Sequence, residues 1–296
     1  MALLSEKYLN GPEVVALTTV FGNVNESQVF TNTQRILTIA QRIEIPIYRG
    51  CSSAFIHSIM SDYFFGFDGL GDNEVENYDL LPAEPTHAAL ALIELSKLYK
   101  GQLIVVAIGA LTNIGLAIKL DPDFSKRLAK LYIGAGHIYS EEFKEAEFNA
   151  AMDAEGYHMS VNDSSPHDLI IVPYSPVRTD LKIEKDWRIK VLGAIPTAVM
   201  EYLNKFERLS LAAATNWSLL DPAVMAVCLH QSVVDEWRTA LSSIILCGKD
   251  RAVTPHNFSS KIPNARVTVA FNIEEYKKFL YAVFSSPINN NNDDYY

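Results

Sequence analysis

The stretch that most constrains the fold covers residues 103–122, with the sequence LIVVAIGALTNIGLAIKLDP. It opens with an apolar, β-branched run over 103–108 that is too short for a helix, which predicts a buried strand. Gly109 permits a tight turn, and Thr112 and Asn113 offer side-chain oxygens that suit the N-cap of a following helix. Open α/β sheets bind ligands where a strand turns into a helix. The alternative is an ordinary β–turn–α unit without chemistry.

Similar patterns recur along the chain and predict alternating strands and helices. Strands are expected at 14–20, 45–48, 103–108, 131–133, 169–172, 243–247 and 265–270. Helices are expected at 26–42, 88–98, 153–161, 196–206, 222–234 and 273–284. This alternation predicts the α/β class, with an open, mostly parallel sheet that carries helices on both faces. We expect one domain over 1–288 and a disordered tail over 289–296, whose sequence is NNNNDDYY after Ile288.

Composition limits the kinds of partner that the protein can bind and the compartment in which it is expected. The formal net charge of −10 argues against binding nucleic acid or an anionic membrane surface. No stretch is long and apolar enough to span a bilayer, and the first residues lack the features of a signal peptide. Cys51, Cys228 and Cys247 lie far apart without metal-binding spacing, so we expect reduced thiols and a cytoplasmic protein.

Six short motifs, in order, resemble the inosine/uridine-preferring nucleoside hydrolases. They are VALTTVFGNV (15–24), PIYRG (46–50), GFDGLGD (66–72), GALTN (109–113), AEFNAAMD (146–153) and LDPAVMA (220–226). The resemblance implies a nucleoside hydrolase-like fold and cleavage of the N-glycosidic bond of purine or pyrimidine ribonucleosides. It also implies a Ca²⁺ ion that binds the ribose hydroxyls and the attacking water, and a homo-oligomer. The partner it implies is a nucleoside or ribose.

The resemblance also implies roles for individual residues. Asn23, Glu147 and Asn149 match the residues with which the family binds ribose. Asp221 and the backbone carbonyl of Thr112 match two of the calcium ligands. Without the resemblance, Asn23 is explained as the end of a strand and Glu147 as the cap of a helix.

The chain departs from the family pattern where the chemistry depends on it. The Asp-x-Asp-x-x-x-Asp-Asp motif, which ends the family's first strand and supplies the calcium cage and the general base, does not occur in this sequence. The residues from Met1 onward match the helix that follows the motif, so the first strand is expected to be missing. The family's proton-donating His corresponds to Leu220, which cannot donate a proton. His137, just after a predicted strand, is a candidate replacement acid.

Two hypotheses follow from these departures. In the first, the native protein is a working calcium-dependent hydrolase of which this sequence lacks the amino terminus. In the second, the chain is a non-enzymatic family member that binds nucleoside or ribose or serves as an oligomer partner. For the sequence as it stands, the loss of the general base alone predicts a rate reduction of about 10²–10⁴-fold. Calcium binding is doubtful because Ca²⁺ needs six to eight oxygen ligands.

Overall fold

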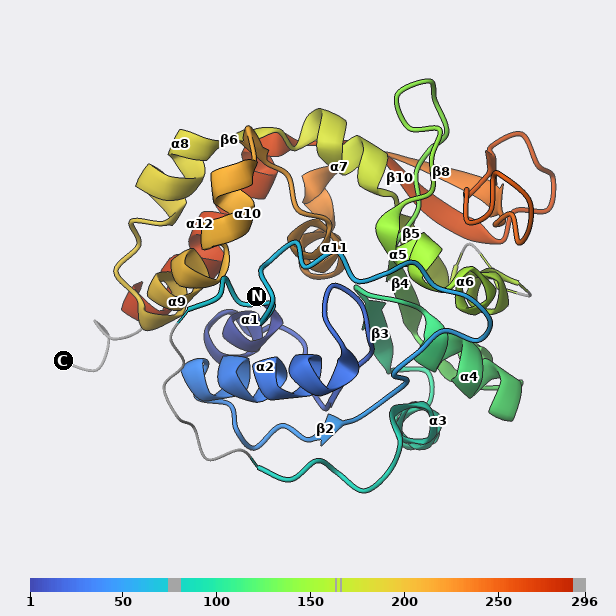
Figure 1. Cartoon of the computed structure of the whole chain (residues 1–296), viewed down its shortest axis with the longest axis horizontal. Helices are drawn as coiled ribbons and strands as arrows, with labels where there is room; N and C mark the ends of the chain where they lie inside the picture. The colour runs from blue at the N-terminus through green and yellow to red at the C-terminus, as the bar shows by residue number, and fades with distance from the viewer. Residues whose placement is uncertain (74–80, 163, 166, 290–296) are drawn as a thin grey trace.

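A computed structural model describes residues 1–73, 81–162, 164–165 and 167–289 (Figure 1). The strands are β1 (Leu17–Thr18), β2 (Ile47–Tyr48), β3 (Ile104–Ala107), β4 (Lys130–Gly134), β5 (Leu169–Val172), β6 (Ile183–Glu184), β7 (Asn216–Trp217), β8 (Val234–Ser242), β9 (His256–Asn257) and β10 (Ala265–Phe271). The α-helices are α1 (Ala2–Leu9), α2 (Glu26–Ile39), α3 (Ala88–Leu98), α4 (Thr112–Leu120), α5 (Phe148–Met152), α6 (Ala154–Val161), α7 (Tyr174–Asp180), α8 (Lys185–Trp187), α9 (Ala198–Phe206), α10 (Arg208–Ala213), α11 (Leu220–Leu229) and α12 (Ile273–Asn289). Short turns of other helix types are η1 (Ser125–Arg127), η2 (Arg188–Leu192) and η3 (Gln231–Val233).

The central sheet has the strand order β3-β4-β5-β10-β8-β9. β3, β4, β5 and β10 are parallel, whereas β8 runs antiparallel to β10 and β9 antiparallel to β8. β1 and β2 form a separate parallel pair, and β6 and β7 an antiparallel pair. The predicted open, mixed and mostly parallel α/β sheet is confirmed. Within the described part of the chain, β3 is an edge strand of the central sheet.

Successive residues of the central strands enter opposite hydrophobic cores. Leu131 and Ile133 of β4 and Ile171 of β5 pack in the core shared with α3, α4 and α6. Tyr132 of β4 and Ile170 of β5 pack in the core shared with α7, α11 and α12. Figure 1 shows these two groups of helices on opposite sides of the sheet. Full burial of one such Leu or Ile side chain contributes about 1.5–3 kcal/mol to folding, so both faces are needed for stability.

Several predicted elements need correction. The strand expected over 14–20 is reduced to β1, because its partner β2 is only two residues long and follows Pro46, which has no N–H. The helix expected over 222–234 ends at Leu229, and β8 begins at Val234. Charged residues at solvent-facing positions of β8 hid the apolar pattern by which a strand is predicted. The strand expected over 243–247 was wrong, because β8 ends at Ser242.

The end of the chain only partly tests the expected tail. Asn289 ends α12, whereas 290–296 lie outside the described residues. Among the residues described, no helix combines the length and the apolar character needed to cross a bilayer.

Candidate active site

The candidate site lies where parallel strands end at their carboxyl termini, the edge at which open α/β sheets bind ligands. β4 ends at Gly134, and α11 packs directly against it. A Cβ atom at Gly134 would lie 2.5 Å from Cγ2 of Val224, so the absence of a side chain permits this approach. The packing brings the first turn of α11, with Leu220 and Asp221, to the end of β4.

Glu147 is buried just before α5 and caps this helix. Its carboxylate accepts hydrogen bonds from the backbone N–H groups of Gly136 (2.8 Å), Asn149 (3.0 Å) and Ala150 (3.1 Å). Burial raises the pKa of Glu147, and the three N–H donors oppose that rise. Glu147 is therefore positioned at the predicted site, and it also has the capping role that the local sequence suggested.

Asn149 connects the ends of two neighbouring strands. Its Nδ2 atom donates to the carbonyl oxygens of Gly134 at 2.8 Å and Ile108 at 3.4 Å. No hydrogen bond to its Oδ1 atom is found within the described residues. Asn149 and Glu147 thus lie together, as their positions in the sequence predicted. Each uses most of its hydrogen-bonding groups in bonds to the protein itself.

Asn23 lies at a different strand end, after β1. Its Nδ2 atom donates to Oδ1 of Asp62 at 2.8 Å. Two further bonds hold the same segment over the turn, from Ser61 Oγ to the Gly22 carbonyl (2.6 Å) and from the Tyr63 N–H to the Asn23 carbonyl (3.2 Å). In this conformation the Asn23 amide holds the 61–63 segment, and a ligand would have to displace or share Asp62.

Asp221 stands in the first turn of α11 and is half-buried. Within the part of the chain that the structure describes, its carboxylate makes no hydrogen bond. Burial and, secondarily, the charge of Glu147 raise the pKa of Asp221 to about 7. Both the acid and the carboxylate are therefore present near neutral pH. Leu220 beside it is packed in the core and contributes no proton.

Within the described residues, the predicted metal ligands Asp221 and Thr112 are not part of a larger cluster of metal-binding side chains. Thr112 is the first residue of α4, and its Oγ1 atom donates to Oδ2 of buried Asp153 at 2.6 Å. No group of three or more His, Cys, Asp or Glu residues suited to a metal ion occurs in the described ranges. In the part of the chain that the structure describes, Asp221 and the Thr112 carbonyl alone fall short of the six to eight oxygens of a Ca²⁺ shell.

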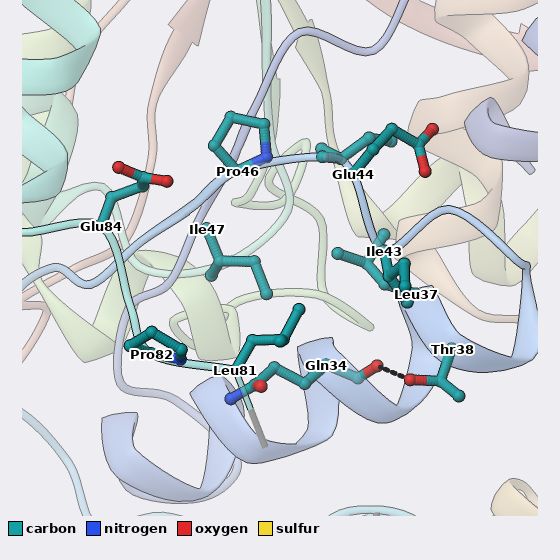
Figure 2. A pocket seen from close by; sticks show the side chains of 11 residues that line it. Gln34, Leu37, Thr38, Ile43, Glu44, Pro46, Ile47, Leu81, Pro82 and Glu84 are labelled. Atoms are coloured by element: carbon teal, nitrogen blue, oxygen red, sulfur yellow. Dashed lines mark hydrogen bonds between the residues drawn. The ribbon is translucent and has the colours of Figure 1, made fainter. Parts of the chain in front are cut away.

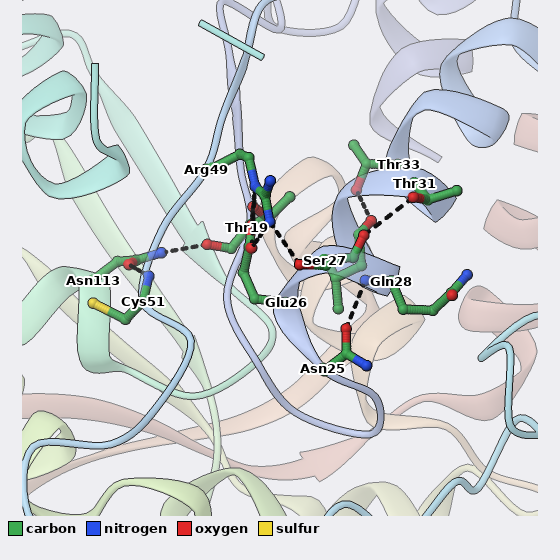
Figure 3. A network of polar contacts seen from close by, with 11 residues as sticks. Thr19, Asn25, Glu26, Ser27, Gln28, Thr31, Thr33, Arg49, Cys51 and Asn113 are labelled. Atoms are coloured by element: carbon green, nitrogen blue, oxygen red, sulfur yellow. Dashed lines mark hydrogen bonds and ion pairs between the residues drawn. The ribbon is translucent and has the colours of Figure 1, made fainter. Parts of the chain in front are cut away.

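The N-cap predicted from Thr112 and Asn113 was wrong, because Leu111 occupies that position. Asn113 instead links α4 to the β1–β2 pair (Figure 3). Its Nδ2 atom donates to the Thr19 carbonyl at 2.8 Å, and its Oδ1 atom accepts from the Cys51 N–H at 2.9 Å. The sequence identified the residue but not its role, since both partners are distant in the chain.

An ion pair between buried Glu26 and partly exposed Arg49 anchors α2 beside this link. Glu26, at the start of α2, accepts from Thr19 Oγ1 at 2.6 Å and forms an ion pair with Arg49 (Figure 3). Burial alone would raise the pKa of Glu26, but the hydrogen bonds and charge of Arg49 hold it below its usual value. The anchor fixes the end of β1 from which Asn23 projects.

Aromatic and cationic residues that sequence reasoning missed surround His137. Its ring centroid lies 5.0 Å from that of Phe143 and 6.0 Å from that of Tyr174, and Arg178 lies over both of those rings. Burial and then the charge of Arg178 lower the pKa of His137 to about 4. This shift favours the uncharged imidazole at neutral pH, and the role of His137 as a replacement acid stays a prediction. Tyr174 follows β5 and carried no motif that marked it.

The comparisons with known proteins assign the family. The profile described as inosine-uridine preferring nucleoside hydrolase matches residues 1–278, so the chain belongs to this family. It is 32% identical to uridine nucleosidase 1 of Arabidopsis thaliana over 79% of this chain and 68% of that protein. It is 27% identical to the inosine-uridine preferring nucleoside hydrolase of Crithidia fasciculata over 80% of this chain and 76% of that protein.

Other matches are shorter or structural. The 37% identity to probable uridine nucleosidase 2 of Arabidopsis thaliana covers 43% of this chain and 41% of that protein. A solved plant nucleoside hydrolase has the same fold, with a TM-score of 0.85 at 24% identity over 97% of this chain and 96% of that one. The family generally uses a metal ion. The ligands described above, Asp221 and the Thr112 carbonyl, are fewer than such an ion requires.

Proposed function

We propose that this chain binds ribonucleosides at the ends of β3 and β4 and that, in the form given by this sequence, it hydrolyses their N-glycosidic bond slowly. The observation that carries the proposal is the position of Glu147, Asn149 and Asp221 around one strand end in a member of the nucleoside hydrolase family. Inosine and uridine, which appear in the names of its relatives, are the expected ligands.

Each of these side chains has a distinct task in the proposed complex. Asn149 Oδ1 is an open acceptor for a ribose hydroxyl. A carboxylate has about four lone-pair positions, so the three N–H bonds to Glu147 leave about one for the ligand. Asp221 accepts a hydroxyl proton as the carboxylate or donates one as the acid. Its pKa of about 7 is suited to general acid–base work at neutral pH.

Calcium supports catalysis in this proposal only if further oxygen ligands are added. When bound, the ion would activate the attacking water and orient the ribose. Asp221 and the Thr112 carbonyl would contribute to its shell, but no group of three or more His, Cys, Asp or Glu residues suited to a metal ion occurs among the described residues. We therefore expect the chain as given to bind nucleoside without calcium.

The test combines binding and turnover on the purified chain. Calorimetry with inosine and uridine, each with CaCl₂ or with EDTA, should show weak binding that the chelator leaves unchanged. Ribose release should stay far below the roughly 1–10³ s⁻¹ typical of enzymes, and Asp221→Asn should abolish what remains. Calcium-stimulated turnover in that range, or tight binding lost on chelation, would contradict the proposal.

The compartment and the oligomeric state of the protein are also part of the proposal. Cys51, Cys228 and Cys247 are free thiols, which supports a reducing compartment and hence the cytoplasm. Self-association as a homo-oligomer is supported by apolar side chains left exposed between β2 and α3, of which Met60 and Phe67 are 88% and 78% exposed. Light scattering at several concentrations tests it, and a monomer throughout would refute it.

A further inference from the structure

A cavity of about 310 Å³ lies at the amino end of β2, the opposite end from the candidate active site (Figure 2). The second half of α2, the turn into β2 and residues 81–84 enclose it. Its volume is at the lower end of the range for small-molecule sites.

Gln34 of α2 is the polar group that distinguishes this cavity. The residue is 6% exposed, and both Nε2 and Oε1 are buried without a hydrogen-bond partner among the residues that the structure describes. Figure 2 shows its carboxamide turned toward Leu81, away from Thr38. Gln28, on the same helix, bonds Asn32 at 2.9 Å. A buried amide whose nitrogen and oxygen both lack a hydrogen bond is unfavourable. A ligand that bonds to both atoms would therefore lower the free energy of the protein.

The surroundings of Gln34 define the ligand further. The walls are aliphatic and include Leu37, Ile45, Ile47, Leu81 and Pro82. Such walls favour an uncharged, flat or compact apolar body over a hydrated one.

The rim is acidic. Glu44 and Glu84 line the cavity, and both are exposed. Glu44 has an ion pair with Arg42, whereas Glu84 lies on the other side of the cavity opening. Two carboxylates at an opening disfavour phosphates and carboxylic acids.

We propose that this cavity is a second ligand site, which binds a neutral lactam heterocycle, the chemical class of free pyrimidine and purine bases. A lactam edge places an N–H beside a C=O. The ligand C=O accepts from Gln34 Nε2, and the ligand N–H donates to Gln34 Oε1. This pairing satisfies both buried atoms at once, while the ring lies between the aliphatic walls. The proposal does not depend on hydrolysis at the candidate active site.

Calorimetry with uracil as the probe tests the site, because uracil has two lactam edges. Its 1,3-dimethyl derivative keeps the ring but has no N–H donor. We expect uracil to bind with one-to-one stoichiometry and the dimethyl derivative to bind at least tenfold more weakly. Gln34→Leu should weaken uracil binding at least tenfold. The matched control Gln28→Leu, on the same helix but outside the cavity lining, should stay within twofold of the natural protein.

Other outcomes refute the proposal. It fails if uracil does not bind, if the dimethyl derivative binds equally well, or if Gln34→Leu retains full affinity, which would place the uracil elsewhere. Should Gln34→Leu not fold, Ile43→Trp gives the same answer, because Ile43 is an exposed lining residue whose enlargement fills the cavity. Unchanged uracil affinity in Ile43→Trp would equally overturn the assignment.

Discussion

Replacement of Asn113 by alanine tests how the β1–β2 pair is held to the rest of the molecule. The side chain of Asn113 pairs two backbone groups, the Thr19 carbonyl at 2.8 Å and the Cys51 N–H at 2.9 Å. Gly50 shows how tight this junction is, since a Cβ there would lie 2.3 Å from the Thr19 carbonyl oxygen and 2.4 Å from the Asn113 amide. Alanine removes both bonds and opens a small polar void.

The expected loss of stability can be estimated from these contacts. A buried backbone group left without its partner costs about 1–3 kcal/mol, so two cost about 2–6 kcal/mol. Alanine regains roughly 0.5 kcal/mol through its higher helix propensity, because Asn113 lies in the first turn of α4. The net loss is about 2–5 kcal/mol, which corresponds to a fall in melting temperature of about 4–10 °C for a chain of this size.

Thermal unfolding and amide hydrogen exchange together measure this effect. Exchange should accelerate at the Cys51 N–H, since local opening is expected to begin where the bond is lost. Asn216→Ala is the control, because Asn216 is an exposed residue of β7, and surface changes of this kind stay within about 0.5 kcal/mol. A melting temperature within 1 °C of the natural protein, roughly the size of the control effect, together with unchanged Cys51 protection, would show that water replaces the amide without loss.

Three further changes have expected outcomes. Arg188 is fully buried with its guanidinium on Glu207, so Arg188→Met should destabilise by about 3–5 kcal/mol in urea unfolding, and a loss below 1 kcal/mol would contradict this ion-pair argument. Burial lowers the pKa of His256 to about 4, so the folded state resists protonation and stability falls as the pH drops from 6.5 towards 4. This loss amounts to about 3 kcal/mol, and His256→Gln should remove it from the difference in stability between pH 7 and pH 4. Gln34→Leu should stabilise the ligand-free protein by about 1–3 kcal/mol, measured by thermal unfolding, and destabilisation would show that its amide is paired.

The parts of the fold that the sequence predicted are those with strong local patterns. α3 and β5 have the predicted bounds, because an amphipathic helix and a short apolar run are distinctive on their own. β8 was missed for the opposite reason. Its residues Asp235, Glu236 and Arg238 are charged, and only its pairing with β10 makes it a strand. Long-range pairing of this kind leaves no mark in a local window.

The site was predicted only in part for a related reason. Family motifs located Glu147, Asn149 and Asp221, and the structure brings them to one strand end. The same motifs could not show that Asn23 is bonded to Asp62, because that bond joins residues 39 positions apart. Arg178 was missed as well, since its proximity to His137 depends on α7 packing beyond β5.

The polar groups of the site also explain why Asp221 should dominate ligand affinity. The Glu147 carboxylate accepts three backbone N–H bonds, and Asn149 donates its Nδ2 hydrogens to two carbonyls. These bonds fix both side chains, which lowers the entropic cost of binding, but they leave few atoms for two vicinal hydroxyls. Asp221 makes no such hydrogen bond among the described residues, and its pKa of about 7 lets it accept or donate a proton. Nucleoside affinity should therefore follow the charge of Asp221 across pH 6–8, and it should lose that dependence in Asp221→Asn.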